Sequence, residues 1–247
     1  EKLQPEVLKK SNIQRPYIRF QSSKKNSGER VLLLKQASYS YGQETVLDNV
    51  SLEILRGERV VVIGNNGAGK TTLLKLLASV HVPTLGQLEI GHNVLPSYFP
   101  QSHLDAIGKD TDMSMFEWLR KHNTCATDQM LREALGRMLF SGDTPQKAIR
   151  SLSGGETARF VLAHMTLQEH NLLILDEPNN HMDIESVVAL AQALRDYKGT
   201  VVVSSHDRDL IESVGTKIVS IENRQVTAFS GTFEEWTADQ KGKKTKK

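Results

Sequence analysis

Two kinds of feature are missing from this chain, and each absence excludes a class of protein. Only one cysteine, Cys125, occurs in 247 residues, which excludes a disulfide framework and zinc modules built on cysteine pairs. No apolar run approaches the roughly 20 residues that a membrane-spanning helix needs, and no secretory signal stands at the start. The chain begins at Glu1 and not with Met. We therefore expect a fragment or processed product of a longer cytoplasmic protein.

Charge is concentrated at the two ends of the chain. Residues 1–30 and residues 240–247 each carry a net charge of +5, so the total of +2 leaves −8 for the remainder. Basic ends on an acidic body fit a polyanionic partner such as RNA, although charge taken alone is explained more simply by two solvated, disordered tails. We expect a basic linker or arm over 1–30 and a lysine-rich tail over 240–247.

Between these ends, helix and strand patterns alternate. Short apolar, β-branched runs of the kind found in buried parallel strands are separated by amphipathic stretches. This alternation predicts an α/β fold with a mainly parallel central sheet covered on both faces. We expect strands at 31–37, 50–55, 59–63, 172–175, 200–204 and 217–221, a strand pair within 86–99, and helices at 72–79, 114–122, 128–140, 153–168, 184–194 and from Thr232.

These elements suggest one domain with two smaller parts. The first two strands are expected to form a small antiparallel sheet around a turn near Gly42. Residues of about 102–168 contain few β-branched residues before the helix at 153–168, and we expect them to form an inserted helical subdomain. The whole nucleotide-binding domain is predicted to span 31–239.

The most informative segment is a glycine-rich loop between a predicted strand and a leucine-rich helix. It fits the template of a phosphate-binding loop, in which backbone N–H groups and a helix N-terminus face anionic oxygens. Lys70 would reach the β- and γ-phosphates, and the Thr71 hydroxyl would ligate Mg²⁺. We therefore predict that a nucleoside triphosphate binds residues Gly64, Asn65, Asn66, Gly67, Ala68, Gly69, Lys70, Thr71 and Thr72.

Polar side chains follow two later apolar strands. Asp176 and Glu177 come directly after residues 172–175, and His206 follows the strand at 200–204. Ligands of open α/β sheets bind at the carboxyl ends of the strands. Asp176 is therefore placed to hold Mg²⁺, Glu177 to orient or deprotonate an attacking water, and His206 to reach the γ-phosphate. The alternative is a solvated strand end with a structural histidine.

A second candidate anion site opens the helix at 153–168. Ser153 is a favourable N-cap residue, and Gly154 and Gly155 leave N–H groups unobstructed at the positive end of the helix dipole, with Glu156 next in sequence. Either two anions bind within one chain, or this site is offered to a nucleotide held by another domain. The pattern alone does not choose between the two.

Together these motifs resemble those of the ATP-binding cassette ATPases, in the order of that family and over residues of about 31–236. The resemblance implies a P-loop NTPase fold in which two cassettes hold two ATP molecules head to tail, each capped by the Ser-Gly-Gly segment of the facing cassette. It further implies that Tyr41, or less readily Tyr39, stacks on adenine, and that Gln101 contacts the metal or the attacking water. Asp183 would lie in the loop that communicates across the dimer, and Arg159 in the helix that follows Ser153.

Within the family, the chain is most similar to the ABC-F group, which lacks membrane domains and typically carries two cassettes in tandem. Glu156 stands where transporters usually carry Gln, residues 180–183 read Asn-His-Met-Asp, and only fourteen residues separate Gly86 from Gln101. The basic stretch before residue 31 resembles the end of the linker between two cassettes, which makes this the second cassette. Asn179 departs from the usual Thr, which puts exchange across the dimer in doubt.

The resemblance implies a Mg²⁺-dependent ATPase that works with a second cassette and acts on the ribosome and its RNA, in translation or in resistance to ribosome-targeting antibiotics. The alternative is the nucleotide-binding subunit of a membrane transporter, in which the helical subdomain would receive a coupling helix. A DNA-repair or chromosome-maintenance ATPase would carry long heptad insertions or zinc-binding cysteines, and this chain has neither.

Overall fold

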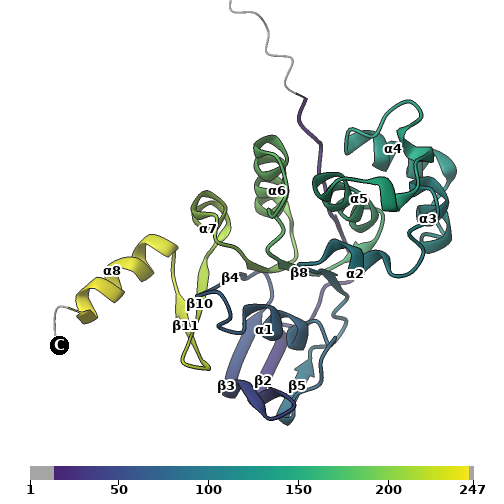
Figure 1. Ribbon diagram of the computed structural model, residues 1–247. Helices are drawn as coiled ribbons and strands as arrows, with labels where there is room; N and C mark the ends of the chain where they lie inside the picture. The colour runs from purple at the N-terminus through teal and green to yellow at the C-terminus, as the bar shows by residue number, and fades with distance from the viewer. Residues whose placement is uncertain (1–13, 245–247) are drawn as a thin grey trace, which may run out of the picture.

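A six-stranded sheet forms the centre of the protein in the computed structural model, which describes residues 14–244 (Figure 1). Every neighbouring pair is parallel except the edge pair of β10 (Lys217–Glu222) and β11 (Gln225–Ser230), which confirms the mainly parallel sheet. The middle strands are short and fully buried, as expected of strands covered on both faces. In spatial order the strands are β11, β10, β4 (Arg59–Gly64), β9 (Thr200–Ser204), β8 (Leu172–Asp176) and β6 (Pro96–Phe99).

Alternate residues of these strands enter two separate cores. Val61 and Val203 pack with α5 (Gly154–Thr166), α6 (Ile184–Asp196) and α7 (Arg208–Val214) on one face. Val62 and Val202 pack with α1 (Lys70–Leu77) on the other face. Because successive side chains of a strand point to opposite faces, one apolar run serves both layers. Figure 1 shows α6 and α7 on one side of the sheet and α1 on the other.

A three-stranded antiparallel sheet packs beneath α1 in the order β3 (Glu44–Leu55), β2 (Arg30–Tyr41), β5 (Leu85–Ile90). Gly42 makes the turn between β2 and β3 with φ of 60°, a conformation open to glycine. The strand pair expected within 86–99 is present as two strands, but they do not pair with each other. β5 joins β2, whereas β6 joins β8 in the central sheet. A local sequence pattern identifies a strand but does not indicate which other strand it pairs with in a sheet.

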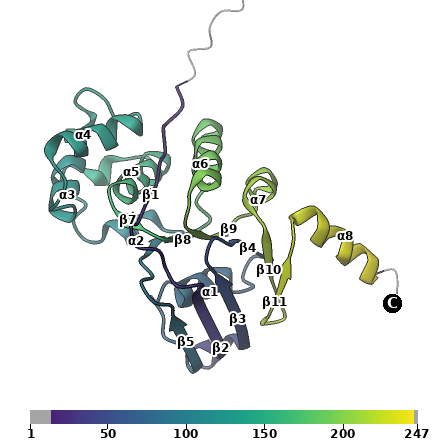
Figure 2. The ribbon, with the colours of Figure 1, turned by 180° about the vertical axis from the view of Figure 1, so that it is seen from behind.

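The helical subdomain contains α2 (His103–Ile107), α3 (Met115–His122), α4 (Asp128–Arg137) and α5, with 3₁₀ turns at Thr144–Gln146 and Ile149–Ser151. Ser114 and Glu117 form a capping box at the start of α3. Trp118 of α3 packs edge to face on Phe160 of α5, with ring centroids 5.4 Å apart. Figures 1 and 2 both show this subdomain beside α6 at one end of the sheet.

Part of the segment expected to be a solvated arm is packed against the domain. Ile18 and Phe20 are buried, and β1 (Gln21–Ser22) pairs in parallel with β7 (Glu169–His170). Figure 2 shows this segment running between α5 and α6. Buried side chains at every second position are enough to anchor an extended strand, although the segment as a whole is polar. Residues 1–13 of the expected arm lie outside the described residues.

The last element, α8 (Phe233–Lys244), extends away from the sheet in both ribbon views. Thr232 and Glu235 make the predicted reciprocal cap, with Thr232 N–H donating to Glu235 Oε2 at 2.7 Å and Glu235 N–H to Thr232 Oγ1 at 3.3 Å. The helix continues through Lys244, so it includes the first residues of the predicted lysine-rich tail. Residues 245–247 lie outside the described part of the chain.

Candidate active site

The glycine-rich loop connects β4 to α1 and turns through backbone conformations that favour glycine. Gly67 and Gly69 have φ of 80° and 104°. A Cβ atom at Gly69 would lie 2.9 Å from Cγ1 of Val46, so a side chain there would be strained and obstructed. Helix α1 begins directly after this turn, at Lys70. Its first N–H groups have no intrahelical acceptor and are available to an anion.

Three polar side chains converge beside this loop. Lys70 Nζ donates hydrogen bonds to the carbonyl oxygens of Gly64 at 3.1 Å and Asn65 at 3.4 Å. It also lies 2.9 Å from His206 Nε2 and 3.8 Å from Glu177 Oε1. His206 Nε2 is 3.3 Å from the same carboxylate oxygen. An ammonium, an imidazole and a carboxylate from three separate elements therefore meet at one point.

Glu177 is positioned by its backbone. It follows β8 with φ of 46°, a conformation that is uncommon for a residue with a side chain. Its N–H donates to the carbonyl oxygen of Ser204 at 3.1 Å and lies 3.0 Å from the Ser204 hydroxyl. Only 4% of Glu177 is exposed. Uncommon backbone conformations of this kind are found preferentially at functional sites, where the surrounding structure holds them in place.

Asp176 lies behind Glu177 and is completely buried. Its Oδ1 accepts a hydrogen bond from the Ser204 hydroxyl at 2.7 Å, whereas its buried Oδ2 has no hydrogen-bond partner among the described residues. Burial and the neighbouring Asp176 carboxylate raise the pKa of the Tyr98 hydroxyl above its usual range. A buried carboxylate oxygen without a protein donor is a fit ligand for a hard cation, directly or through water.

Lys70, Glu177 and His206 line a cavity of about 620 Å³, called here the Lys70 cavity, a volume typical of small-ligand sites. Asp176 does not line it and lies beside Glu177 in the buried end of β8. Thr71 and Gln101, the other oxygen donors predicted for the metal, line the same cavity, so the donor set suits Mg²⁺. Tyr41 also lines this cavity and is 48% exposed. The lining residues are Tyr41, Val46, Asn66, Gly67, Gly69, Lys70, Thr71, Thr72, Gln101, Glu177, Asn180 and His206.

The remaining loop residues face another direction. Gly64, Asn65 and Ala68 line a second cavity of about 670 Å³, together with Phe233 and Trp236 of α8. Gly64 and Asn65 nevertheless help to position Lys70 in the first cavity, because their carbonyl oxygens accept hydrogen bonds from Lys70 Nζ. A larger cavity of about 920 Å³ lies between residues 15–22 and α6 and contains none of the predicted catalytic residues.

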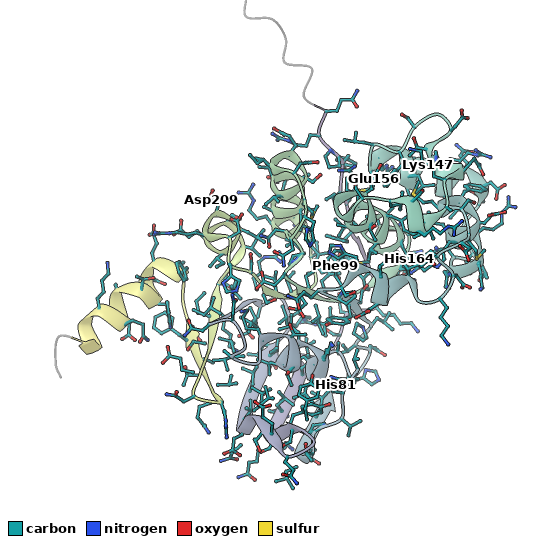
Figure 3. All side chains as sticks on the ribbon, in the orientation of Figure 1. His81, Phe99, Lys147, Glu156, His164 and Asp209 are labelled. Atoms are coloured by element: carbon teal, nitrogen blue, oxygen red, sulfur yellow. The ribbon has the colours of Figure 1, made fainter. Side chains whose placement is uncertain are left out.

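The Ser-Gly-Gly segment is not part of the Lys70 cavity. Ser153 caps α5, its N–H donates to Glu156 Oε2 at 2.8 Å, and the hydrogen bonds from Ser153 lower the pKa of Glu156. The glycines lie against His181, since a Cβ at Gly154 would be 3.2 Å from that of His181 and one at Gly155 would be 2.7 Å from its carbonyl oxygen. In Figure 3, Glu156 is labelled on the helical subdomain and His81 beside the three-stranded antiparallel sheet, on opposite sides of the central sheet.

Asp183 also lies with the Ser-Gly-Gly group and not in the cavity. Its carboxylate accepts a hydrogen bond from the Ser186 N–H at 2.7 Å, capping α6, and pairs with Arg159 at 3.1 Å. Burial alone would raise the pKa of Asp183, but the bonds from Ser186 and the Arg159 charge leave it below its usual value. Arg159, predicted on the helix after Ser153, therefore connects the two segments.

Sequence reasoning missed several residues that shape the site. Ser204 holds both Asp176 and Glu177, Tyr98 lies beside Asp176, and Asn180 and Val46 line the cavity. The position of Ser204 at the end of a strand neighbouring β8 was a usable signal, since polar residues ending adjacent parallel strands share one edge. Val46 had no such signal, because nothing in an apolar residue of β3 indicates that it faces the loop.

Comparison with known sequences agrees with this geometry. The sequence model of the family described as ABC transporter matches residues 47–180, more than half of the chain. The chain is 36% identical over 237 residues to the probable ATP-binding protein YbiT of Escherichia coli O157:H7, covering 96% of this chain and 44% of that protein. It is 34% identical over 235 residues to ABC transporter F family member 2 of Arabidopsis thaliana, covering 94% of this chain and 34% of that protein.

The chain belongs to the ATP-binding cassette ATPases, within their ABC-F group. This confirms the family resemblance, the fold class and the assignment as an ATPase cassette. The cassette spans less than half the length of these curated relatives. Across residues 14–244, no helix of the cassette combines the length and apolar character needed to cross a membrane.

Proposed function

We propose that this cassette binds MgATP in the cavity beside Lys70 and hydrolyses it when a second cassette closes over the triphosphate. The observation that carries the proposal is the meeting of Lys70, Glu177 and His206 at the mouth of the phosphate-binding loop. Tyr41 lines the other part of the same cavity and offers an exposed ring to adenine. Asp176, Thr71 and Gln101 would hold Mg²⁺, which neutralises charge on the phosphate oxygens.

Different residues of the chain carry out different parts of the proposed ATP hydrolysis. Lys70 and the N–H groups of the loop bind and orient the β- and γ-phosphates. Glu177 orients a water molecule for attack on the γ-phosphorus and accepts its proton as the bond to the bridging oxygen breaks, releasing ADP and phosphate. His206 contacts the γ-phosphate and stabilises the charge that develops there. Before that step, Lys70 and His206 face the Glu177 carboxylate, at 3.8 Å and 3.3 Å from its Oε1.

A second cassette is needed because the chain separates its two anion-binding groups. Ser153, Gly154 and Gly155 lie outside the Lys70 cavity and line none of it. The N–H groups of Gly154 and Gly155, in the first turn of α5, have no intrahelical acceptor and are suited to the γ-phosphate of ATP bound elsewhere. The partner is either an upstream cassette of the same protein or a second copy of this one, and Asp183 would lie at the junction between them.

The ribosome, with its RNA, is the proposed target of the cassette. Membership of the ABC-F group supports this. The basic residues of the first 30 positions add favourable electrostatics for RNA. Translation and protection of the ribosome against antibiotics are both roles that such binding would serve, and the cytoplasm is the proposed location.

Replacing Glu177 with Gln tests the catalytic assignment. Glutamine retains the size of the side chain but removes the base, so we expect MgATP binding to persist while hydrolysis falls by about 100-fold or more. Because ATP then stays bound without being hydrolysed, closed pairs of cassettes should accumulate. Turnover is measured by phosphate release, and pairing by light scattering with and without MgATP.

A matched control is Glu133→Gln, which alters an exposed glutamate on α4 that pairs with Arg137. This variant should retain the activity of the unmodified chain. Phosphate release from Glu177→Gln at the rate of the control would refute the proposed role of Glu177. If Glu177→Gln loses hydrolysis but its cassettes do not pair in MgATP, the arrangement in which two cassettes share each ATP site is refuted.

A further inference from the structure

Three aromatic side chains form a cluster at the end of the nucleotide cavity that Tyr41 lines. The His81 ring is stacked on Tyr39, with centroids 4.8 Å apart and planes 11° from parallel. Tyr39 meets Tyr41 edge to face at 5.1 Å. The Tyr41 hydroxyl lies 3.2 Å from Nε2 of His81, within hydrogen-bond distance. Each ring therefore contacts both of the others.

The position of His81 is fixed by the helix that begins in the phosphate-binding loop. The N–H groups of Val80 and His81 donate to the Lys75 carbonyl oxygen of α1 at 2.9 Å and 3.1 Å. Lys70, the first residue of that helix, holds the phosphate end of the cavity. One rigid element therefore carries the phosphate ligand at its start and the anchor of the aromatic cluster just beyond its end.

The same loop is tied back to the strand that carries Tyr41. Thr84 N–H donates to the Ser38 carbonyl oxygen at 2.8 Å, and Ser40 N–H donates to the Thr84 hydroxyl at 3.1 Å. The backbone around His81 is thus held on both sides. Tyr41, by contrast, is the last residue of β2 and is 48% exposed. An exposed ring at a strand end is restrained mainly by what its side chain touches.

We propose that His81 is a positioning residue that fixes the plane of the Tyr41 ring against the base of the bound nucleotide. This inference rests on the proposed function, in which Tyr41 stacks on adenine. A preoriented ring loses less conformational freedom on binding, so part of the affinity for the base comes from the hydrogen bond to His81. His81 thereby raises the preference for nucleotides over triphosphates that have no base, while leaving the phosphate contacts unchanged.

The experiment compares MgATP with magnesium tripolyphosphate, which lacks the base and ribose, by isothermal titration calorimetry. His81→Phe retains a ring to stack on Tyr39 but has no atom to bond the Tyr41 hydroxyl. Tyr41→Phe retains the stacking face and removes the same bond from the other side. The double variant completes the cycle, and Tyr41→Ala removes the stacking ring altogether. His92→Phe is the control, since His92 is an exposed histidine that follows β5 of the three-stranded antiparallel sheet.

We expect His81→Phe and Tyr41→Phe each to weaken MgATP binding by about three- to tenfold, the effect of one net hydrogen bond. The double variant should be no weaker than either single one, because both remove the same interaction. Tripolyphosphate affinity and the thermal unfolding midpoint should match those of the control. In turnover assays, the KM for ATP should rise by the same factor while kcat at saturating ATP is unchanged.

Failure of this inference is distinguishable from failure of the proposed function. If Tyr41→Ala weakens MgATP binding but His81→Phe does not, the positioning role of His81 is overturned and the adenine site stands. If Tyr41→Ala leaves MgATP binding unchanged, the base does not stack on Tyr41 and the proposed adenine site falls as well. A loss of tripolyphosphate affinity in His81→Phe equal to the loss of MgATP affinity would show a general disturbance of α1 and also overturn the inference.

Discussion

The chemistry proposed for this cassette depends on a few side chains that differ in their immediate contacts. Asp176 and Glu177 are adjacent in sequence and both buried, yet they have different surroundings. Glu177 faces Lys70 and His206, whereas Asp176 faces the Ser204 hydroxyl. These different surroundings support the separate roles that we propose, Glu177 beside the attacking water and Asp176 at the metal.

Ser204→Ala tests the part of this arrangement that the sequence did not reveal. The change removes the hydrogen bond to Asp176 and leaves the buried carboxylate without a protein donor. We expect the free energy of unfolding to fall by about 1–3 kcal/mol without Mg²⁺. The Mg²⁺ concentration needed for half-maximal ATP hydrolysis should also change, because the geometry of Asp176 is no longer fixed.

Urea unfolding and a magnesium titration of ATP hydrolysis measure the two effects. Ser213→Ala is the control, since that hydroxyl bonds the Leu210 carbonyl oxygen on α7, outside the Lys70 cavity. Equal stability and equal magnesium dependence in the two variants would show that Ser204 does not position Asp176.

At the scale of elements, α5 joins the Ser-Gly-Gly segment to the interior of the helical subdomain. Near its end, His164 lies 4.9 Å from the Trp118 ring and 3.0 Å from the Asn123 amide nitrogen. His122 faces it with ring centroids 6.4 Å apart. Burial, with a smaller contribution from His122, lowers the pKa of His164 to about 4.

This shift predicts a loss of stability in mild acid. The unfolded chain, with a histidine pKa near 6.5, binds a proton at higher pH than the folded chain does. Stability is therefore complete above about pH 6.5 and falls as the pH decreases toward 4. For His164 the loss amounts to about 2 kcal/mol between pH 7 and pH 5. Urea unfolding at the two pH values measures it.

His164→Gln should reduce this difference by about the same amount, because glutamine does not titrate. The control is His92→Gln, which makes the same substitution at an exposed histidine and leaves His164 in place. Other buried histidines, His103 and His170, also have lowered pKa values and remain in both variants. Identical pH dependence in the two variants would contradict the assignment to His164.

At the same scale, sequence patterns located elements better than their partners. Residues 172–175 were predicted as a buried strand because they form a short apolar run, and β8 is present there, extended to Asp176. The strands within 86–99 were predicted, but β5 and β6 belong to different sheets. Likewise, Phe20 packs on both His170 and Tyr197, at centroid distances of 5.8 Å and 6.1 Å, although these residues are far from it in sequence.

At the scale of the whole molecule, ATP binding is expected to couple closure of two cassettes to contact with the ribosome. A hydrolysis-deficient protein should accumulate in that state. We expect the Glu177→Gln form of the full-length protein to co-sediment with ribosomes in MgATP and to remain in the supernatant with membranes alone. Gel analysis of the pellets measures the bound fraction.

The same assay at increasing salt tests the electrostatic part. If phosphate contacts dominate, affinity should fall steeply, by about a thousandfold or more between 50 and 200 mM salt for six or more contacts. Salt-insensitive binding would remove the role proposed for the basic ends. Recovery with membranes but not with ribosomes would favour the alternative of a transporter subunit.

The sequence alone defined the fold class, the phosphate-binding loop, the strand that ends in Asp176 and Glu177, and the capped start of α5. Each is encoded within a continuous stretch, where glycine, chain polarity and apolar periodicity act on near neighbours. Only the tertiary structure showed that Ser204 holds Asp176, that His81 contacts Tyr41, and that Ser153 lies outside the Lys70 cavity. Those relations join residues on separate strands and helices, and their distances are set by packing that no local pattern records.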